Sequence, residues 1–505
     1  MTRKAQVAIV TLSTLIIYVS LNSLARALDP SAFVWYEEDW EERSWIATSR
    51  FWLDRKACRW LSICGLAHLQ KAHSPFGHRD PASWTSLDEP DAEPDAEPGL
   101  WSSFWTSGAN QSEWAAEERS KREIPDYVFE YAPLVHLYSQ EQFWPSDIAE
   151  HLYHTTPSLN YTPIQADGGR LTLNDLDRLN EFNGRHVFLT SNDNVESRPP
   201  WLEGEANIPK NDREKDPVDE MRPGWDEQPD PTDPGDAEDT DDWTDLRDEQ
   251  TRVEQEREQA RLWDQARKRF RQELRKRYGG KKPQEPLAGS PGGRSDAPAV
   301  LLTIDKGNGV VDAFWFFFYS FNLGNAVFNI RFGNHVGDWE HCLVRFHHGK
   351  PKALFFSAHT AGEAYRYEAV EKIGRRPVIY SAEGSHAMYA TAGIHPYILP
   401  WGLLYDVTDK GPLWDPLLNS HTYTYDGQEK TLRASTVTPN APTEWFYFRG
   451  HWGDKFYPLG DTRQYRFAGQ YHYVNGPLGP RFKRLNRNKM CQGSDWSPCL
   501  IRDSI

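Results

Sequence analysis

Four side chains that could bind a metal ion or transfer protons lie within seven positions near the middle of the chain, at His335, Asp338, Glu340 and His341. Carboxylate-rich sites favour Mg, Ca or Mn, and imidazole ligands also admit Zn. The same groups suit general acid–base chemistry. In the alternative interpretation, the acids form a solvated strand face and His341 is a structural core histidine. Neither an HExxH nor a CxxC motif accompanies the cluster, so the spacing alone does not decide.

The elements that carry these residues are predicted to be β-strands. The run Phe314–Tyr319 is rich in aromatic side chains, which favour strands. A second strand is expected over Asp338–Phe346. Because successive side chains in a strand point to opposite faces, one face should carry Asp338, Glu340 and Cys342, and the other Trp339, His341 and Leu343.

A third strand is expected over Ala353–His359, after a turn at Gly349-Lys350. A hairpin centred on that turn would place His359 opposite Glu340. A slip of one residue would undo this pairing and the pairing of Ser357 with Cys342. We therefore predict a site to which both arms of the hairpin contribute.

A further polar group, Glu383-Gly384-Ser385-His386, follows a β-like run at Pro377–Ala382. A serine beside a histidine suggests nucleophilic catalysis. However, adjacent strand residues point to opposite faces, and a G-x-S-x-G elbow is lacking. We expect this group to line the same site instead. The predicted metal ligands are His335, Asp338 and Glu340, with His359 assisting, and the predicted lining residues are His341, Ser357, Ser385 and His386.

Several ordered blocks of this sequence resemble the fungal vacuolar protein sorting-associated protein 62 family. They cover more than half of the chain, and the family implies a role in delivering proteins to the vacuole, without a settled biochemical activity. The most specific blocks are Phe316–Asn322, Gly333–His341, Phe356–His359 and Arg376–Ala387. Others lie within Ile124–Ser197 and at Leu413–Pro416, Trp452–Pro458 and Tyr473–Pro480.

A narrower resemblance links the central motif to necrosis-inducing cytolysins of microbes, which carry G-H-R-H-D-W-E and a downstream S-A-H. In those β-sandwich toxins, the first His, the Asp and the Glu surround a divalent metal beside a surface that binds sphingolipid head groups. This chain keeps His335, Asp338 and Glu340 at that spacing, but Asn334 is inserted and Gly337 replaces the second His. The resemblance implies metal binding more than cytolysis.

The N-terminus indicates entry into the secretory pathway. A short basic start precedes the apolar run Val7–Leu21, and Ala25-Arg26-Ala27 resembles a cleavage site, so residues 1–27 are predicted to be a signal peptide or a signal anchor. Residues 7–25 could hold the chain in a membrane if they are not cleaved. A net charge of −16 argues against nucleic acid as a partner. A nucleotide cofactor is not expected either.

Glycosylation motifs and cysteines agree with that route. Acceptor triplets begin at Asn110 and Asn160. Five cysteines fit an oxidising compartment. The nearest pairs, Cys58 with Cys64 and Cys491 with Cys499, are the disulfide candidates, which leaves Cys342 as a buried thiol, although sequence cannot fix the connectivity.

Many short aromatic runs separated by turn residues predict a mainly β protein, with an antiparallel β-sandwich or jelly-roll-like domain and short helices. The domain should span residues 124–490. An acidic, disordered insertion at 201–297 should interrupt it and contain one charged helix at 246–278. Residues 28–123 are expected to be variable and partly disordered, and 491–505 to form a C-terminal tail.

The sequence favours a secretory-pathway binding module over an enzyme, without settling the matter. The module would be metal-dependent, would support vacuolar delivery, and would bind membrane lipid head groups or sorting cargo. One alternative is a metal-assisted hydrolase that uses Glu340 or Asp338 as its base. The other is a secreted, cytolysin-like sphingolipid-binding protein. The sequence leaves the oligomeric state open.

Overall fold

The computed structural model describes residues 13, 17, 37–69, 100–109, 111–164, 170–210, 292–327, 329–397, 404–467, 469–493 and 498–505. Three predicted features lie outside these residues: nearly all of the signal segment 1–27, the charged helix 246–278 and the glycosylation acceptor Asn110. Within the described residues, no helix combines the length and the apolar character needed to cross a membrane.

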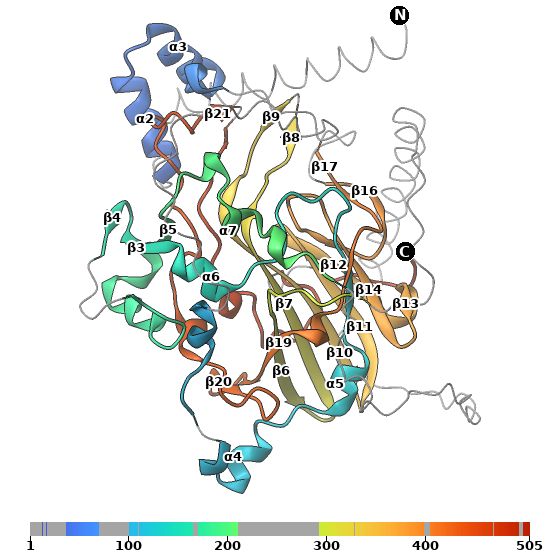
Figure 1. Ribbon diagram of the computed structural model, residues 1–505. Coiled ribbons are helices and arrows are strands. Elements are labelled where there is room, and N and C mark those ends of the chain that lie inside the picture. Colours follow the sequence, from blue (N-terminus) through green and yellow to red (C-terminus); the bar gives the residue numbers. More distant parts are fainter. Residues whose placement is uncertain are drawn as a thin grey trace, which may run out of the picture.

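The fold is organised around an eight-stranded sheet with the strand order β20-β19-β6-β7-β10-β11-β12-β23. Its two longest strands, β7 and β10, pair along their whole length in the middle of the sheet (Figure 1). The strands are β6 (Ala299–Gly307), β7 (Val310–Asn322), β10 (His335–His347), β11 (Lys350–Ala358), β12 (Ala361–Arg366), β19 (Ser420–Asp426), β20 (Thr431–Ala434) and β23 (Ile501–Arg502).

A smaller sheet packs on one face of the central sheet. It contains β2 (Leu134–His136), β13 (Lys372–Ile373), β14 (Arg376–Ser381), β15 (Met388–Tyr389) and β18 (Leu413–Trp414). Val135, Ile379 and Trp414 of this sheet share one buried cluster with Trp315 and Phe317 of β7. The predicted mainly β, sandwich-like architecture is therefore confirmed. It differs in detail, because three strand pairs, β2–β14, β6–β19 and β12–β23, are parallel.

The opposite face of the central sheet is covered by short helices and small β-structures. Phe316 and Trp339 lie in a second buried cluster on this face, together with Leu152 and Trp445. The alternating side chains of β7 thus fill two cores, which explains the nearly continuous aromatic run. The covering elements are α6 (Ile148–Tyr153), β3 (Thr155–Leu159), β4 (Thr162–Pro163), β5 (Val187–Ser191) and the 3₁₀ turns Leu176–Phe182 and Glu444–Tyr447.

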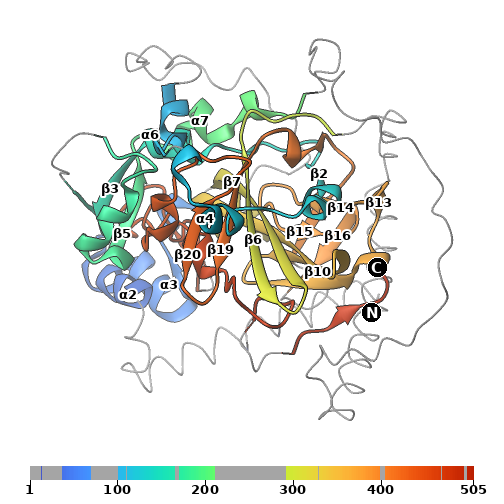
Figure 2. The same ribbon diagram turned by 90° about the horizontal axis from the view of Figure 1, so that it is seen from below.

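The remaining elements lie around the edges of the two sheets. Two short helices lead into the domain, and two small hairpins extend beyond the end of the central sheet (Figures 1 and 2). They are α4 (Ala116–Ser120), α5 (Asp126–Glu130), β8 (Ala326–Val327) with β9 (Ile330–Arg331), and β16 (Gly393–Pro396) with β17 (Tyr405–Thr408).

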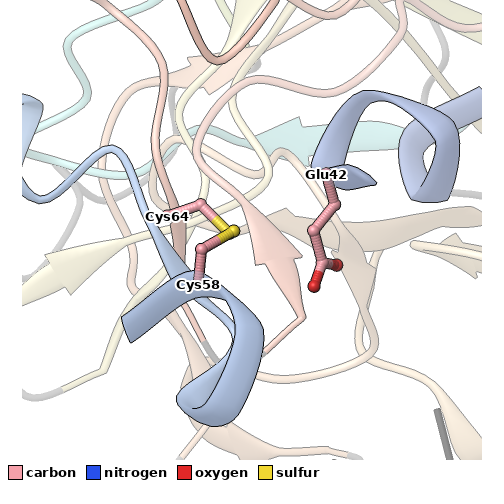
Figure 3. Close-up of side chains that lie close together, drawn as sticks. All are labelled: Glu42, Cys58 and Cys64. Carbon is pink, nitrogen blue, oxygen red and sulfur yellow. A yellow bond between two sulfur atoms is a disulfide. The ribbon is translucent and has the colours of Figure 1, made fainter. Parts of the chain in front are cut away.

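Ordered structure begins well before the predicted domain start at residue 124. Residues 28–123, expected to be variable and partly disordered, contain two ordered helices, α2 (Glu37–Thr48) and α3 (Trp52–Leu61). They are followed by β1 (Ile63–Cys64), which pairs with β21 (Arg466–Phe467) and through it joins β22 (Gln470–Tyr471). The predicted disulfide Cys58–Cys64 is present and fastens the end of α3 to β1 (Figure 3).

Both borders of the predicted insertion contain ordered structure. Trp201 and Leu202, in α7 (Pro200–Glu203), are buried in the core. The backbones of Lys210 and Arg294 pair across the gap between the described segments. The C-terminal tail also contributes to the fold, since it contains the second predicted disulfide, Cys491–Cys499, and adds β23 to the central sheet.

Candidate functional site

The candidate site lies where β7 and β10 end, and the two strands fix its geometry. Their register places Asp338 opposite Tyr319 and His335 opposite Asn322. Asp338, Glu340 and Cys342 share a strand face, as the period of two predicts, and both carboxylates are buried. Two acids brought into the protein interior at this spacing must be compensated by hydrogen bonds or by positive charge.

A glycine allows this end of β10 to approach a distant loop. Gly337 has φ +71°, and a Cβ on it would overlap the carbonyl oxygen of Trp452. Gly453 makes the reciprocal contact with the carbonyl of Val336. Position 337, where the cytolysin motif has its second histidine, therefore has no room for a side chain here, and its carbonyl instead accepts a hydrogen bond from His335.

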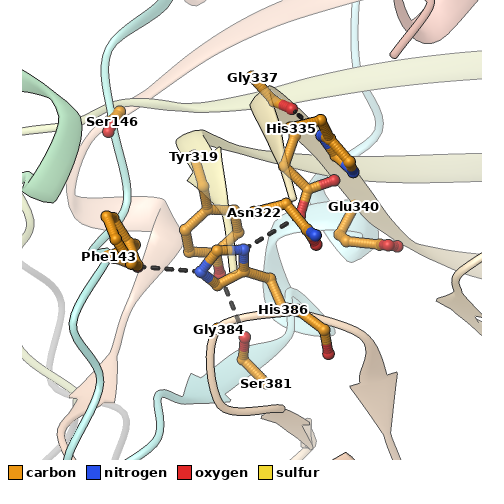
Figure 4. A network of polar contacts seen from close by, with 12 residues as sticks. Phe143, Ser146, Tyr319, Asn322, His335, Gly337, Glu340, Ser381, Gly384 and His386 are labelled. Carbon is orange, nitrogen blue, oxygen red and sulfur yellow. Dashed lines mark hydrogen bonds and ion pairs between the residues drawn. The ribbon is translucent and has the colours of Figure 1, made fainter. Parts of the chain in front are cut away.

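Asp338 is paired with His386, which the sequence analysis predicted to line the site. His386 Nδ1 lies 3.0 Å from Asp338 Oδ2, and its Nε2 lies 2.9 Å from the carbonyl oxygen of Phe143 (Figure 4). The His386 ring stacks on Tyr319 with 3.7 Å between ring centroids. Burial alone would lower the pKa of His386, but the hydrogen bond to Asp338 and the charge of Glu141 raise it above its ordinary value. The imidazolium form, with both nitrogens donating, matches these two acceptors.

Glu340 is held by Ser357, in a register that differs from the predicted one. The hairpin turns at His348-Gly349 rather than at Gly349-Lys350, and a bulge follows between Arg345 and Phe346. The net effect is a shift of one residue, so that Cys342 faces Phe356. The predicted pairing of Ser357 with Cys342 is therefore wrong, and so is that of His359 with Glu340.

In the actual register, Ser357 still serves the carboxylate. Its hydroxyl donates to Glu340 Oε2 and accepts from the backbone N–H of His341 at 2.7 Å. Burial, and then the charge of Asp338, raise the pKa of Glu340 to about 7. A carboxyl group with this pKa exchanges a proton near neutral pH.

His335 has the orientation expected of a metal-binding imidazole. Its ring is half-buried, and its Nδ1 donates to the carbonyl oxygen of Gly337 at 2.6 Å. Burial lowers the pKa of His335, so the ring is neutral and Nε2 carries a lone pair. A ring with one nitrogen held by a backbone carbonyl is typical of histidines that bind metals through the other nitrogen.

His359 and Ser385 belong to a neighbouring cluster centred on Asp406. His359 Nε2 lies 2.7 Å from Asp406 Oδ2, and the Ser385 hydroxyl donates to Oδ1 at 2.8 Å. Asn325 and Tyr389 donate to the same carboxylate, at 2.9 and 2.6 Å. Burial would raise the pKa of Asp406, but these partners, His359 foremost, lower it. Since Ser385 and His386 have different partners, they do not form a nucleophile–base pair.

His341 lies on the other face of the sheet, as the strand period predicts, and does not line the site. Its fully buried ring packs among Phe314, Phe316 and Phe355. Neither ring nitrogen has a hydrogen-bond partner in the described structure, and burial holds its pKa well below the ordinary value. Its assignment as a pocket-lining residue is corrected, because its environment is that of a core histidine.

Two residues near the carboxylates were missed by the sequence reasoning. Asn322 is opposite His335 on β7, and its amide nitrogen donates to the carbonyl of Gly333 at 3.0 Å (Figure 4). Glu141 accepts the backbone N–H of Gly384 at 2.9 Å and so holds the loop that carries His386. The β7–β10 pairing could have identified Asn322, whereas Glu141 comes from a distant loop and gives no local signal.

The side chains at this site, two carboxylates and an imidazole, are of the types that bind divalent cations. Within the described structure, Asp338 Oδ1 and Glu340 Oε1 accept no hydrogen bond, whereas the other oxygen of each is held by His386 or Ser357. Among the described residues, His335, Asp338 and Glu340 do not bring three ligand atoms within 4.8 Å of one another. An ion bound by all three would therefore need side-chain movement or bridging water, which suits Mg, Ca or Mn better than a closed Zn site.

One group of potential ligands does meet that distance among the described residues: Glu42 with Cys58 and Cys64. It is not a metal centre in this state, because the two sulfurs are joined in a disulfide (Figure 3). In addition, Glu42 pairs with Arg466. The carboxylate–imidazole cluster on β10 therefore remains the candidate.

The fold and the site together define a mainly β protein with a buried carboxylate–imidazole cluster at the end of its central strand pair. A family model described as vacuolar protein sorting-associated protein 62 matches residues 305–401, which include that cluster. Putative vacuolar protein sorting-associated protein TDA6 of Saccharomyces cerevisiae is 36% identical over 409 residues, covering 74% of this chain and 69% of that protein. Vacuolar protein sorting-associated protein 62 of the same yeast is 32% identical over 413 residues, covering 75% and 70%. The chain belongs to the vacuolar protein sorting-associated protein 62 family.

Two solved structures show partial similarity to this chain. Necrosis and ethylene inducing protein 2, from the causal agent of cocoa's witches' broom disease, is 20% identical, with 25% of this chain and 61% of that chain covered and a TM-score of 0.16. NLPPya in complex with glucosamine is 13% identical, with 34% and 77% covered and a TM-score of 0.16. At these TM-scores the likeness carries no inference about this chain.

Proposed function

We propose that this protein supports protein delivery to the vacuole as a non-enzymatic binding module whose site is organised by a divalent cation. Membership of the sorting family supports the cellular role. One observation carries the cation: two buried carboxylates, Asp338 and Glu340, each have one oxygen held by the protein and one without a protein partner. His335 Nε2 would be the third ligand, and the amide oxygen of Asn322, opposite His335, a fourth.

A bound cation would supply positive charge that offsets the two acids and an open coordination position for an oxygen of a partner molecule. The protein supplies the rest. His386 and Ser357 orient the carboxylates, and the Gly337 carbonyl fixes the His335 ring. His359, engaged with Asp406, contributes positive charge near Glu340 rather than a bond through Nε2. Lipid head groups and acidic or hydroxyl-bearing cargo are the partners that such a site would recognise.

A metal-assisted hydrolase is the second candidate, in which Glu340 or Asp338 would act as the base and a bound ion would polarise the substrate. A hydrolase would convert its substrate to product, whereas a binding module would leave its partner molecule chemically unchanged. The serine next to His386 contributes nothing to this candidate, because Ser385 is committed to Asp406.

The test compares the full chain with Asp338→Asn and Glu340→Gln, which remove charge and keep shape. Asp147→Asn is the matched control, since Asp147 is also buried but accepts hydrogen bonds from Trp105 and the Ala149 backbone, on the opposite face of the central sheet. Mg, Ca, Mn or Zn should raise the Tm of the wild type and the control, but not of the two site variants.

The same variants should be introduced into yeast that lacks the two related proteins, with vacuolar delivery of a reporter cargo as the readout. The proposal predicts loss of delivery in the site variants and normal delivery in the control. Normal delivery by both site variants, or a Tm that none of the four metals changes, would refute it. Turnover of lipid or peptide ester substrates that is lost in Glu340→Gln would establish the hydrolase instead.

A further inference from the structure

The most exposed apolar side chains of the described structure are concentrated on the α2–α3 hairpin. Trp52 is 67% exposed, Phe51 60% and Leu53 59%. Trp40 and Trp60 are also exposed. Aromatic side chains of this size usually contribute to a core, so a group of them on one small element indicates a contact surface. Figure 1 shows α3 at the outer end of the molecule, away from both sheets.

The orientation of α3 is fixed, so these side chains cannot turn inward. The inner face carries Asp54 and Cys58, which are buried and one helical turn apart. Asp54 accepts hydrogen bonds from the Trp45 indole and the Gly65 N–H, both at 3.1 Å, and Cys58 is bonded to Cys64. A disulfide and two hydrogen bonds therefore hold α3 with its outer face toward solvent.

The exposed charges on this face are all of one sign. From residue 50 to 61, the only acid is the buried Asp54, whereas Arg50, Lys56 and Arg59 are exposed. Trp52, Lys56 and Trp60 follow one another at the i, i+4 and i+8 positions of α3 and share a stripe. This basic and aromatic face stands out on a chain whose net charge is −16.

Three acids of the neighbouring helix, Glu37, Glu41 and Glu42, are engaged with the body of the protein, Glu42 through Arg466. Glu37 pairs with Lys455 at 2.5 Å, and Glu41 accepts the backbone N–H of Leu459 at 2.9 Å. These three acids are thus paired with the protein, whereas the outer face of α3 carries the exposed Lys56 and Arg59.

We propose that the outer face of α3 docks onto the surface of an anionic phospholipid bilayer. Tryptophan and leucine side chains enter the region between head groups and acyl chains, and Lys and Arg beside them attract anionic head groups. An acidic protein partner would also satisfy the charge, but a protruding convex helix offers no groove for one. The apolar run Val7–Leu21 ends a short distance before α2, so a segment held in the bilayer would keep the hairpin at its surface.

The test measures co-flotation of the full chain with phosphatidylcholine vesicles, with and without phosphatidylserine. Binding should be stronger with phosphatidylserine and should fall as salt is raised. The double variant Trp52→Ser/Leu53→Ser should bind about tenfold more weakly. Lys56→Gln should lose about fivefold on anionic vesicles only, from roughly 1 kcal/mol per charge. Val437→Ser is the matched control, since Val437 is similarly exposed but lies outside the hairpin.

Amide hydrogen exchange of residues 50–61 gives a local readout that does not depend on the N-terminal run. Anionic vesicles should slow exchange there even when EDTA removes divalent ions, which separates this proposal from the cation site. Unchanged exchange on vesicles to which the chain binds would overturn it. So would vesicle binding by the double variant equal to that of the control, or protection of the hairpin by another protein or chain segment but not by lipid.

Discussion

The close approach of the Gly337 backbone to Trp452 provides a sharp test of the site's architecture. Gly337→Ala places a methyl group within 1.7 Å of the Trp452 carbonyl oxygen, a severe steric clash. It also forces a non-glycine residue to φ +71°. The positive φ costs roughly 1–2 kcal/mol. Overpacking a rigid contact costs typically about 1–3 kcal/mol more. We expect a total loss of about 2–5 kcal/mol in unfolding free energy.

The chain supplies its own control four residues earlier. Gly333 has φ +80°, but a Cβ there has nothing within 4 Å. Gly333→Ala should therefore lose only the roughly 1–2 kcal/mol of the backbone conformation. Denaturant unfolding of the two variants measures the difference, which is the cost of the clash. Equal stability of the two would refute the close approach of β10 to the Trp452 loop and, with it, the positioning of His335.

Further predictions concern buried charges elsewhere. Arg345→Ala leaves the fully buried Asp312 without its partner at 2.7 Å and should lower the unfolding free energy by about 3–5 kcal/mol, measured by denaturant unfolding. Arg366→Ala, which removes an exposed ion pair with Asp503, should lower it by at most about 1 kcal/mol. Equal losses in the two variants would contradict this prediction. Burial raises the pKa of Asp147 to about 6, from 3.8. The folded state therefore holds this proton more tightly, and unfolding free energy should fall by about 2 kcal/mol as pH rises from 4 to 6. Asp147→Asn should flatten that slope, and an unchanged slope would count against the assignment.

The alternation of side chains along a strand predicted that the two candidate acids share a face, but it did not predict their hydrogen-bond partners. Asp338 and Glu340 share a face because side-chain alternation is a property of any strand. The pairing of β10 with β11 was wrong by one residue, since the turn lies at His348-Gly349 and a bulge follows it. Bulges depend on packing against the rest of the fold, and the hairpin sequence alone does not specify them.

Strand alternation could not predict the contacts between loops that are far apart in sequence. His386 meets Asp338 because Glu141 holds the intervening loop, and Asp406 collects Ser385 and His359 from two other segments. Such contacts depend on how the two sheets stack, which no local pattern encodes. The N-terminal hairpin was underestimated for a related reason: its order comes from docking against the C-terminal region and from a disulfide.

Calorimetric titration of metal-free protein with Mg, Ca, Mn and Zn tests the central claim most directly. The account predicts about one divalent ion bound per chain, preferentially Mg, Ca or Mn. Metal binding should be abolished in Glu340→Gln. It should be weakened about 10- to 100-fold in Ser357→Ala, because Ser357 orients the Glu340 carboxylate but is not itself a ligand. No heat of binding from any of the four ions, or identical binding in Glu340→Gln, would contradict it.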